Sequence, residues 1–344
     1  GAAATEEIFP GFRVDTGAHW LGGLSEKIIS ELGLGHHRLE ILAADPSVFT
    51  PVESGLPLTI WRDPQKTADS IAEISAADAQ AWIPFTKLIA KAAGIVEAAW
   101  SVTPPDLTGN EARDFWSSAK LGLRLRGLGK KDMIEVTRIL PMSVYELLEE
   151  WFENDLVRGT LASLAVRGMQ HGPMAGGTAY TFLHHQVGAG QGVIAPGRRI
   201  RGGIGNLCAA LVSVCKHHGA EIRLGTPVEQ INVEDGIACG VLLADGQALR
   251  CRRVVSGVDP HNTFFKLLNP LEIETDFARK VDSIRFRGVN AKVHLALNDL
   301  PGFSCRPGPG THLDGAISIS PSLEYVERAC DDAKFGKVSG APCL

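Results

Sequence analysis

The sequence predicts an α/β fold with α+β elements, in which a helical insertion splits one layered structure into two pieces. Three observations support this class. Residues 64–190 are largely helical in pattern, residues 228–256 alternate between apolar and polar positions, and a glycine-rich helix start lies between them at residues 202–207. A doubly wound enzyme would instead alternate strand and helix throughout.

The first part of the chain predicts small elements. Residues 1–23 are loop-like and rich in Gly and Ala, and residues 25–32 have helical spacing of apolar positions. Two short strands are expected at 47–51 and 58–62, on either side of a Gly/Pro turn. Asp63 followed by Pro64 then predicts a helix start, because Asp caps free amides and Pro suits the first helical position.

The helical block carries its own start signals and a core stripe. Ser75 and Ser143 each precede a carboxylate by three residues, which is the pattern that satisfies the free amides of a helix start. An aromatic stripe at helical spacing predicts core packing. Its members are Trp82, Phe85, Ile89 and Ala92.

Beyond residue 188 the pattern changes. The Gly-rich loop at 188–192 leads to a helix from about 202 to 218, which Gly219 ends. Strands are expected at 220–224, 228–233, 238–243 and 249–256, with turns at Asp235-Gly236 and Asp245-Gly246. The elements expected after them are a helix at 259–268, strands at 291–297 and 316–320, and a helix at 322–331.

Composition limits the function classes. The chain has 344 residues, 34 Lys and Arg against 39 Asp and Glu, and 44% hydrophobic residues. This length suggests two domains, and the net charge of −5 argues against nucleic acid as a partner. The sequence contains no run of 18 apolar residues, so no membrane span is predicted. Seven scattered cysteines without a CxxC pair indicate reduced thiols in an intracellular protein, in the cytoplasm or an organelle interior.

Several chemistries lack their motif. The sequence contains no GxSxG, P-loop or HExxH pattern. Adjacent histidines occur at 36–37, 184–185 and 217–218. Because neighbouring residues on a helix point about 100° apart, these pairs are not expected to bind a metal. They are expected to be surface or lightly buried histidines. The closest approach to GxGxxG, from Gly203 to Cys208, has Cys at its third glycine position. Two readings of this helix start stay open: tight packing against a neighbour, or bare amides that face a polar ligand.

Four segments, taken in order, carry a family resemblance. They are Phe9-Pro-Gly-Phe-Arg-Val-Asp15-Thr-Gly17-Ala-His19, Gly202-Gly203-Ile-Gly-Asn-Leu207, Gly219 to Ile231, and Val254-Val-Ser256-Gly-Val-Asp259-Pro260. Together they resemble the phytoene desaturase-related branch of FAD-dependent oxidoreductases, and within it the group named pyridine nucleotide-disulfide oxidoreductase domain-containing protein 2. The resemblance covers nearly the whole chain.

The resemblance implies FAD as cofactor and a set of residues around it. The loop of Asp15, Gly17, Ala18 and His19 would lie along the flavin or its pyrophosphate, with Gly202 and Gly203 near the flavin. Val228 would offer its backbone to the adenine, and Ser256 and Gly257 would border the same pocket. His19 and Trp20 either wall the flavin ring or pack in the core. The sequence identifies no catalytic residue.

The resemblance also implies the domain organisation. An incomplete Rossmann-like FAD-binding domain is expected at 1–45 and 190–270, with an antiparallel β-meander, and a partly helical substrate domain at 46–189 and 271–344. The family's GxGxxG unit would precede Gly1, and its later Gly-Asp segment would follow Leu344. The sequence therefore resembles an internal fragment of a longer protein.

The expected function is that of a desaturase or dehydrogenase. FAD would take a hydride from an apolar or amphipathic small molecule, and oxygen or a quinone would reoxidise it. Peripheral membrane contact and the oligomeric state stay open. Two alternatives remain: a GDP-dissociation-inhibitor-like module that binds a lipidated partner without flavin, and an inactive fragment.

Overall fold

Helices and strands both occur along the chain, and long helices dominate its middle third. The structure is a computed structural model that describes residues 2–103, 112–190, 192–286 and 288–344. Gly1 and Gln191, which belong to predicted loops, lie outside these ranges. The chain divides into two units, residues 1–214 with 288–344 and residues 215–287, and each is described here by itself.

The α-helices of the described residues are α1 (Glu26–Glu31), α2 (Pro64–Ala72), α3 (Ala76–Trp100), α4 (Ala112–Gly127), α5 (Lys130–Ile139), α6 (Val144–Trp151), α7 (Asp155–Val166), α8 (Thr178–Gln186), α9 (Gly205–His217), α10 (Thr275–Asp282) and α11 (Leu323–Lys334). The strands are β1 (Thr5–Phe9), β2 (Phe12–Asp15), β3 (Ile41–Leu42), β4 (Val48–Thr50), β5 (Leu58–Ile60), β6 (Arg199–Ile200), β7 (Val228–Glu234), β8 (Ile237–Leu243), β9 (Ala248–Arg250) and β10 (Ala316–Ile317). This mixture confirms the predicted α/β class, although the sheets are small.

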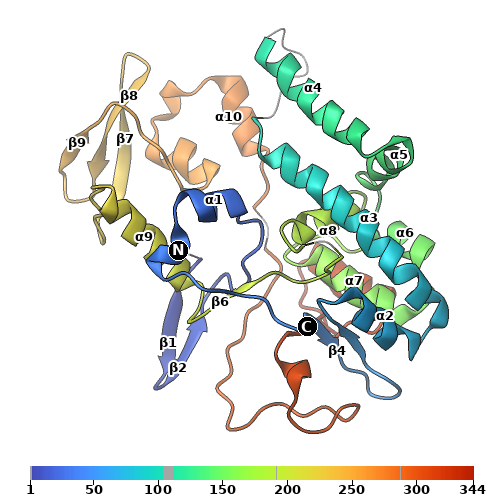
Figure 1. Ribbon diagram of the computed structural model, residues 1–344. Helices are drawn as coiled ribbons and strands as arrows, with labels where there is room; N and C mark the ends of the chain where they lie inside the picture. The colour runs from blue at the N-terminus through green and yellow to red at the C-terminus, as the bar shows by residue number, and fades with distance from the viewer. Residues whose placement is uncertain (1, 104–111, 191, 287) are drawn as a thin grey trace. The chain divides into compact units, whose positions relative to one another are not determined.

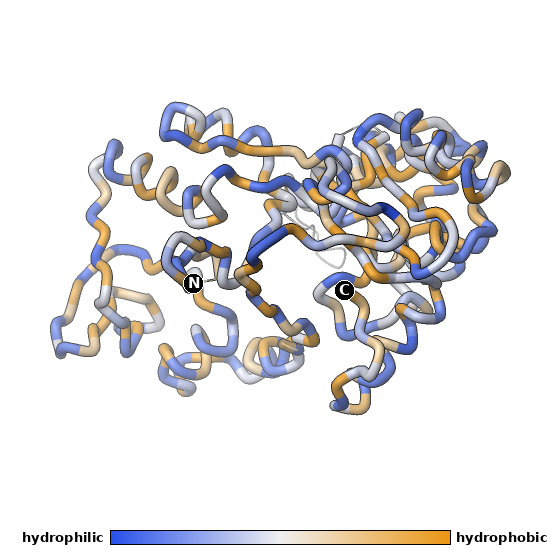
Figure 2. Tube along the Cα trace, turned by 90° about the horizontal axis from the view of Figure 1, so that it is seen from below, coloured by the Kyte–Doolittle hydropathy of each residue, from blue (hydrophilic) through white to orange (hydrophobic). Residues whose placement is uncertain are grey.

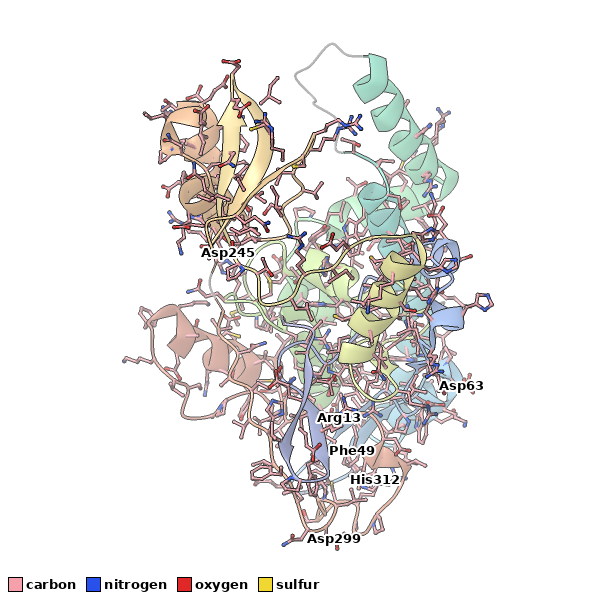
Figure 3. The ribbon with its side chains drawn as sticks, turned by 90° about the vertical axis from the view of Figure 1, so that its left-hand side faces the viewer. Arg13, Phe49, Asp63, Asp245, Asp299 and His312 are labelled. Atoms are coloured by element: carbon pink, nitrogen blue, oxygen red, sulfur yellow. The ribbon has the colours of Figure 1, made fainter. Side chains whose placement is uncertain are left out.

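Three of these sheets lie in the first unit. β1 and β2 form an antiparallel hairpin, and β3 pairs with β6. β4 lies between β5, which is antiparallel to it, and β10, which is parallel to it. Phe49 of β4 also contacts the ring of His312 at a centroid distance of 4.9 Å, and Figure 3 labels both side chains. The last segment of the chain therefore packs back onto β4.

Helices α2 to α8 form the helical block that the sequence predicts, drawn from blue-green to yellow-green in Figure 1. The predicted caps are confirmed: Asp63 accepts from Gln65 N at 2.8 Å, and Ser75 accepts from Asp78 N at 3.2 Å. Ser143 forms a complete capping box, because the carboxylate of residue 146 bonds back to the Ser143 amide. Local hydrogen bonds thus define where these helices begin.

The core of the block is built around the predicted aromatic stripe. Trp82, Phe85, Ile89 and Ala92 are all buried, as expected. The ring of Phe85 lies 4.9 Å from that of Phe152 and 6.2 Å from that of Phe182. Residues of β4, β5 and α11 join the same apolar cluster. A second, smaller cluster packs α9 against the N-terminal segment: Leu21, Leu34, Leu39, Ile200, Ile204, Ala210 and Val214.

The second unit contains the predicted antiparallel meander. β7 pairs with β8 and β8 with β9, and the turn at Asp235-Gly236 has both residues at positive φ, +53° and +74°. The helix expected at 259–268 is confirmed as a π-helix, Asn262–Leu267, and Asp259 accepts from the Asn262 amide at 3.0 Å. All seven cysteines are free thiols.

Four strand predictions need correction. Residues 220–224 and 291–297 form no strand, β9 ends at Arg250 instead of reaching residue 256, and β10 is only two residues long. Apolar side chains in three of these stretches stay exposed, with Leu224 at 88%, Val255 at 95% and Val293 at 77%. The alternation indicated an extended chain, but a strand also needs a partner strand to bond with, and the described residues supply none for residues 220–224 and 291–297.

Figure 2 shows hydrophobic and hydrophilic residues mixed along the coloured, described parts of the chain. Within the described ranges, no helix has the length and apolar character to cross a membrane. The predicted cofactor and substrate domains are not the same as the two units. The units are defined by compactness, whereas the predicted domains are defined by function, so the predicted domains stay a prediction.

Candidate flavin and substrate site

The predicted cofactor loop at residues 15–19 starts where the β1–β2 hairpin ends. Thr5 stands opposite Asp15 across the hairpin, and its hydroxyl donates to the Asp15 carboxylate at 2.6 Å. The same hairpin holds the start of α9. Asp15 Oδ1 accepts from the amide of Ile204 at 2.8 Å, and Thr5 Oγ1 accepts from the amide of Gly205 at 2.8 Å. Two side chains far away in sequence thus cap this helix.

Gly203 makes this junction sterically feasible. Its φ is +98°, and a Cβ built on it would lie 2.6 Å from Asp15 Oδ1 and still closer to Thr5. The sequence left open whether this helix start packs against a neighbour or faces a ligand. The structure shows packing at Gly203, and the amides of Ile204 and Gly205 are occupied by Asp15 and Thr5. Contact of Gly202 and Gly203 with the cofactor stays a prediction.

Gly17 is needed for a similar reason. The amide of Ala18 donates to the carbonyl of Ala2 at 2.6 Å, which draws the loop against the N-terminal segment. A Cβ on Gly17 would overlap the Ala2 carbonyl and lie 3.0 Å from Ala2 Cα. Gly17 is therefore in close contact with the backbone of Ala2, and its predicted approach to the cofactor stays a prediction.

Lys292 completes the loop and is a residue that the sequence did not predict. Its Nζ donates to the carbonyls of Asp15 and Gly17, the latter at 2.7 Å, and lies 3.3 Å from His19 Nδ1. Burial lowers the pKa of Lys292. The available signal was a single lysine within the apolar alternation of residues 291–297, but nothing in that pattern connects it to a loop some 275 positions earlier.

His19 and Trp20 follow the loop and lead into the pocket. Their ring centroids are 5.5 Å apart, and the guanidinium of Arg199 lies 5.8 Å from the Trp20 ring. Burial lowers the pKa of His19, and the nearby charges of Lys292 and Arg167 lower it further. The imidazole of His19 is therefore neutral near pH 7.

A pocket of about 400 Å³ lies beside this loop, within the first unit. The described residues that line it are Trp20, Gly22, Gly23, Trp100, Arg167, His184 and His185. Trp100 ends α3, and its ring lies 4.7 Å from that of His184 on α8. The helical block thus supplies one wall and the N-terminal segment supplies the other. None of these described lining residues carries a carboxylate.

Two polar atoms at this pocket are buried without a hydrogen-bond partner within the described part of the chain. They are Nη1 of Arg167, just beyond the end of α7, and Nε2 of His185, in the last turn of α8. The His184–His185 pair is expected from the sequence to be at the surface or lightly buried. His184 is exposed and His185 is partly buried, and both line the pocket.

His185 predicts a pH dependence of stability. Burial lowers its pKa from 6.5 to about 4, with smaller contributions from Arg167 and His184. In the unfolded chain the ring protonates near pH 6.5, so between pH 6.5 and 4 the unfolded state holds more protons. Stability is therefore complete above pH 6.5 and falls as the pH drops, by at most about 3 kcal/mol from this group.

Urea unfolding between pH 7.5 and 4 checks this expectation. His185→Gln removes the titrating group, so its stability should fall less on acidification than that of the wild type. His218→Gln, at an exposed histidine, is the matched control and should follow the wild type. Equal pH slopes for all three proteins would contradict the buried, neutral His185.

The remaining predicted cofactor residues lie in the second unit. Val228 begins β7 and is 39% exposed. Ser256 Oγ shares a hydrogen bond with Thr263 Oγ1 at 2.8 Å, and Gly257 has open space at its Cβ position among the described residues. Their role at the adenine stays a prediction.

Comparison with known proteins identifies the family. Residues 116–311, more than half of the chain, match the family described as flavin containing amine oxidoreductase. The chain therefore belongs to this family, and FAD is its cofactor. This confirms the resemblance and the cofactor that the sequence motifs indicated.

Individual relatives and a solved structure are also similar to the chain. It is 27% identical over 364 residues to pyridine nucleotide-disulfide oxidoreductase domain-containing protein 2 of Rattus norvegicus, across 100% of the chain and 63% of that protein. A phytoene desaturase (neurosporene-forming) of Cereibacter sphaeroides is 42% identical over 67 residues, covering 20% of the chain and 13% of the desaturase. A crystal structure of the PF1083 protein from Pyrococcus furiosus shares the fold, with a TM-score of 0.50 and 16% identity over 83% of this chain and 56% of that one. The chain thus spans less than two thirds of the length of these curated relatives.

The donor set at the loop and pocket is compatible with FAD. Lys292 and Arg167 are cations, and His19 and His185 supply ring nitrogens. The flavin cofactor carries a pyrophosphate and gains negative charge on reduction, so it is suited to a site of this sign.

Proposed function

We propose that this chain forms part of an FAD-dependent desaturase or dehydrogenase that removes a hydride from an apolar or amphipathic substrate. The single observation that carries the proposal is the pocket of Trp20, Trp100 and Arg167 beside the loop that Lys292 holds. Oxygen or a quinone is the proposed final acceptor. The flavin family favours this enzyme over a GDP-dissociation-inhibitor-like binding module.

In this proposal the loop of Asp15, Gly17, Ala18 and His19 lies along the cofactor. Gly202 and Gly203 approach it from the start of α9, and Val228, Ser256 and Gly257 border the adenine. FAD, when bound, supplies the acceptor for the hydride.

The chain's own residues have three tasks. Lys292 fixes the carbonyls of Asp15 and Gly17, so the loop presents one defined backbone path. Trp20 and Trp100 provide apolar faces that exclude water from the substrate. Forming a double bond also releases a proton from the carbon next to the one that loses the hydride, and the neutral ring of His185, with a pKa of about 4, is the proposed acceptor of that proton.

The absorbance spectrum of the purified whole protein, expressed with any sequence that flanks this chain in its gene, tests the proposal. Flavin bands near one equivalent per chain are expected, and denaturation in acid should release FAD. Anaerobic addition of the substrate should bleach these bands, and air should restore them. A colourless protein that gains no flavin on incubation with FAD would contradict the proposal.

A further inference from the structure

Arg167 is a charged residue at the pocket, and one of its nitrogens lacks a hydrogen-bond partner in the part of the chain that the structure describes. Its Nη1 is buried and donates to no acceptor within the described residues, and these residues supply no carboxylate that pairs with it. Arg158, on α7, has ordinary partners: its Nε donates to the Phe152 carbonyl at 2.6 Å, and its Nη1 lies 3.9 Å from Asp155. A buried guanidinium nitrogen without an acceptor is costly, so the unpartnered Nη1 favours an anionic ligand at Arg167.

The other lining residues indicate the chemical character of the rest of that ligand. Trp20 and Trp100 offer flat apolar surfaces, which suit an aromatic or hydrocarbon body. The pKa values of His184 and His185 are both lowered by burial, so both rings are neutral at pH 7. Arg167 is then the one full charge among the described lining residues, which matches a single negative charge better than a phosphate dianion.

We propose that this pocket binds the carboxylate of an amphipathic organic acid, with Arg167 as the anchor and Trp20 and Trp100 against the apolar body. A planar carboxylate can accept two parallel hydrogen bonds from a guanidinium. The inference rests on the proposed function, because it names the substrate class of the same site. The pocket volume of about 400 Å³ suits a small molecule of this kind.

An anionic group of the cofactor itself is the other source of the same chemistry. The position of Arg167 favours the substrate. It lies at the end of α7 in the helical block, next to His185, whereas the predicted cofactor loop belongs to the N-terminal segment and is held by Lys292. The test therefore has to separate loss of acid binding from loss of flavin.

The experiment is calorimetric titration of the whole protein with 4-phenylbutanoate and with its neutral amide, 4-phenylbutanamide. The wild type should bind the acid about 10- to 100-fold more tightly than the amide. Arg167→Met should abolish this preference while leaving amide binding unchanged, and Arg167→Lys should retain part of it. Arg158→Met, on the same helix but outside the pocket, should leave the preference intact, and circular dichroism shows whether each variant is folded.

Flavin content, measured on the same preparations, completes the test. An Arg167→Met protein that keeps its flavin and loses acid preference supports the inference. A wild type without acid preference, or an Arg167→Met variant that loses flavin and not acid binding, overturns it and assigns Arg167 to the cofactor. A wild type that prefers the acid but contains no flavin defeats the proposed function and leaves the carboxylate site standing.

Discussion

Gly203→Ala is expected to destabilise the junction between the β1–β2 hairpin and α9 by about 3–5 kcal/mol. Two independent effects contribute. Alanine at φ +98° is strained, and its Cβ would lie 2.6 Å from Asp15 Oδ1 and closer still to Thr5. The hairpin must then separate from the helix start, and the bonds from the amides of Ile204 and Gly205 are lost with it.

The loss should appear both in urea unfolding and as a lower ratio of bound FAD to protein, because the predicted cofactor loop continues directly from Asp15. Gly236→Ala is the matched control. It has a similar φ of +74° in the β7–β8 turn but open space at its Cβ position among the described residues, so about 1 kcal/mol is expected there. Adding Thr5→Ala to Gly203→Ala should restore part of the stability. Equal losses for the two single glycine variants would show that the close packing at Gly203 is wrong.

Phe85→Ala should cost about 3–5 kcal/mol of unfolding free energy. The Phe85 side chain is fully buried on α3, and its ring contacts the rings of Trp151, Phe152 and Phe182. Truncation leaves a cavity where several helices of the block meet. Because α3 and α8 also carry Trp100, His184 and His185, the variant should bind pocket ligands more weakly as well.

Denaturant unfolding followed by far-UV circular dichroism measures this cost. Phe335→Ala, at a 79% exposed phenylalanine after α11, is the control and should stay within about 0.5 kcal/mol of the wild type. If Phe85→Ala loses less than about 1 kcal/mol, the aromatic cluster is not the centre of the helical block.

Local signals in the sequence were sufficient for much of the fold. Asp63, Ser75 and Ser143 marked helix starts because a cap depends only on residues two or three positions away. The Asp235-Gly236 turn fixed the β7–β8 hairpin for the same reason. The strands expected at 220–224 and 291–297 did not form, since a strand depends on a partner that its own sequence does not specify.

The same distinction, between signals local in sequence and contacts made only by folding, applies to the candidate site. Tight packing at Gly203 was one of the two readings of the glycine-rich helix start, but its neighbours Thr5 and Asp15 were not predictable, and neither was the contact of Gly17 with Ala2. Arg167 carried no local signal, and the only signal at Lys292 was a single lysine within an apolar alternation. The meaning of a buried cation depends on which groups surround it in three dimensions, and only the folded chain brings Lys292 to residues 15–19.

A crystal structure of the FAD-loaded whole protein, soaked with 4-phenylbutanoate, is the most direct measurement. Our account predicts the cofactor in contact with the main chain of residues 15–19, and the acid's carboxylate on the guanidinium of Arg167. A flavin bound away from that loop, with the space between Trp20 and Trp100 empty, would contradict it.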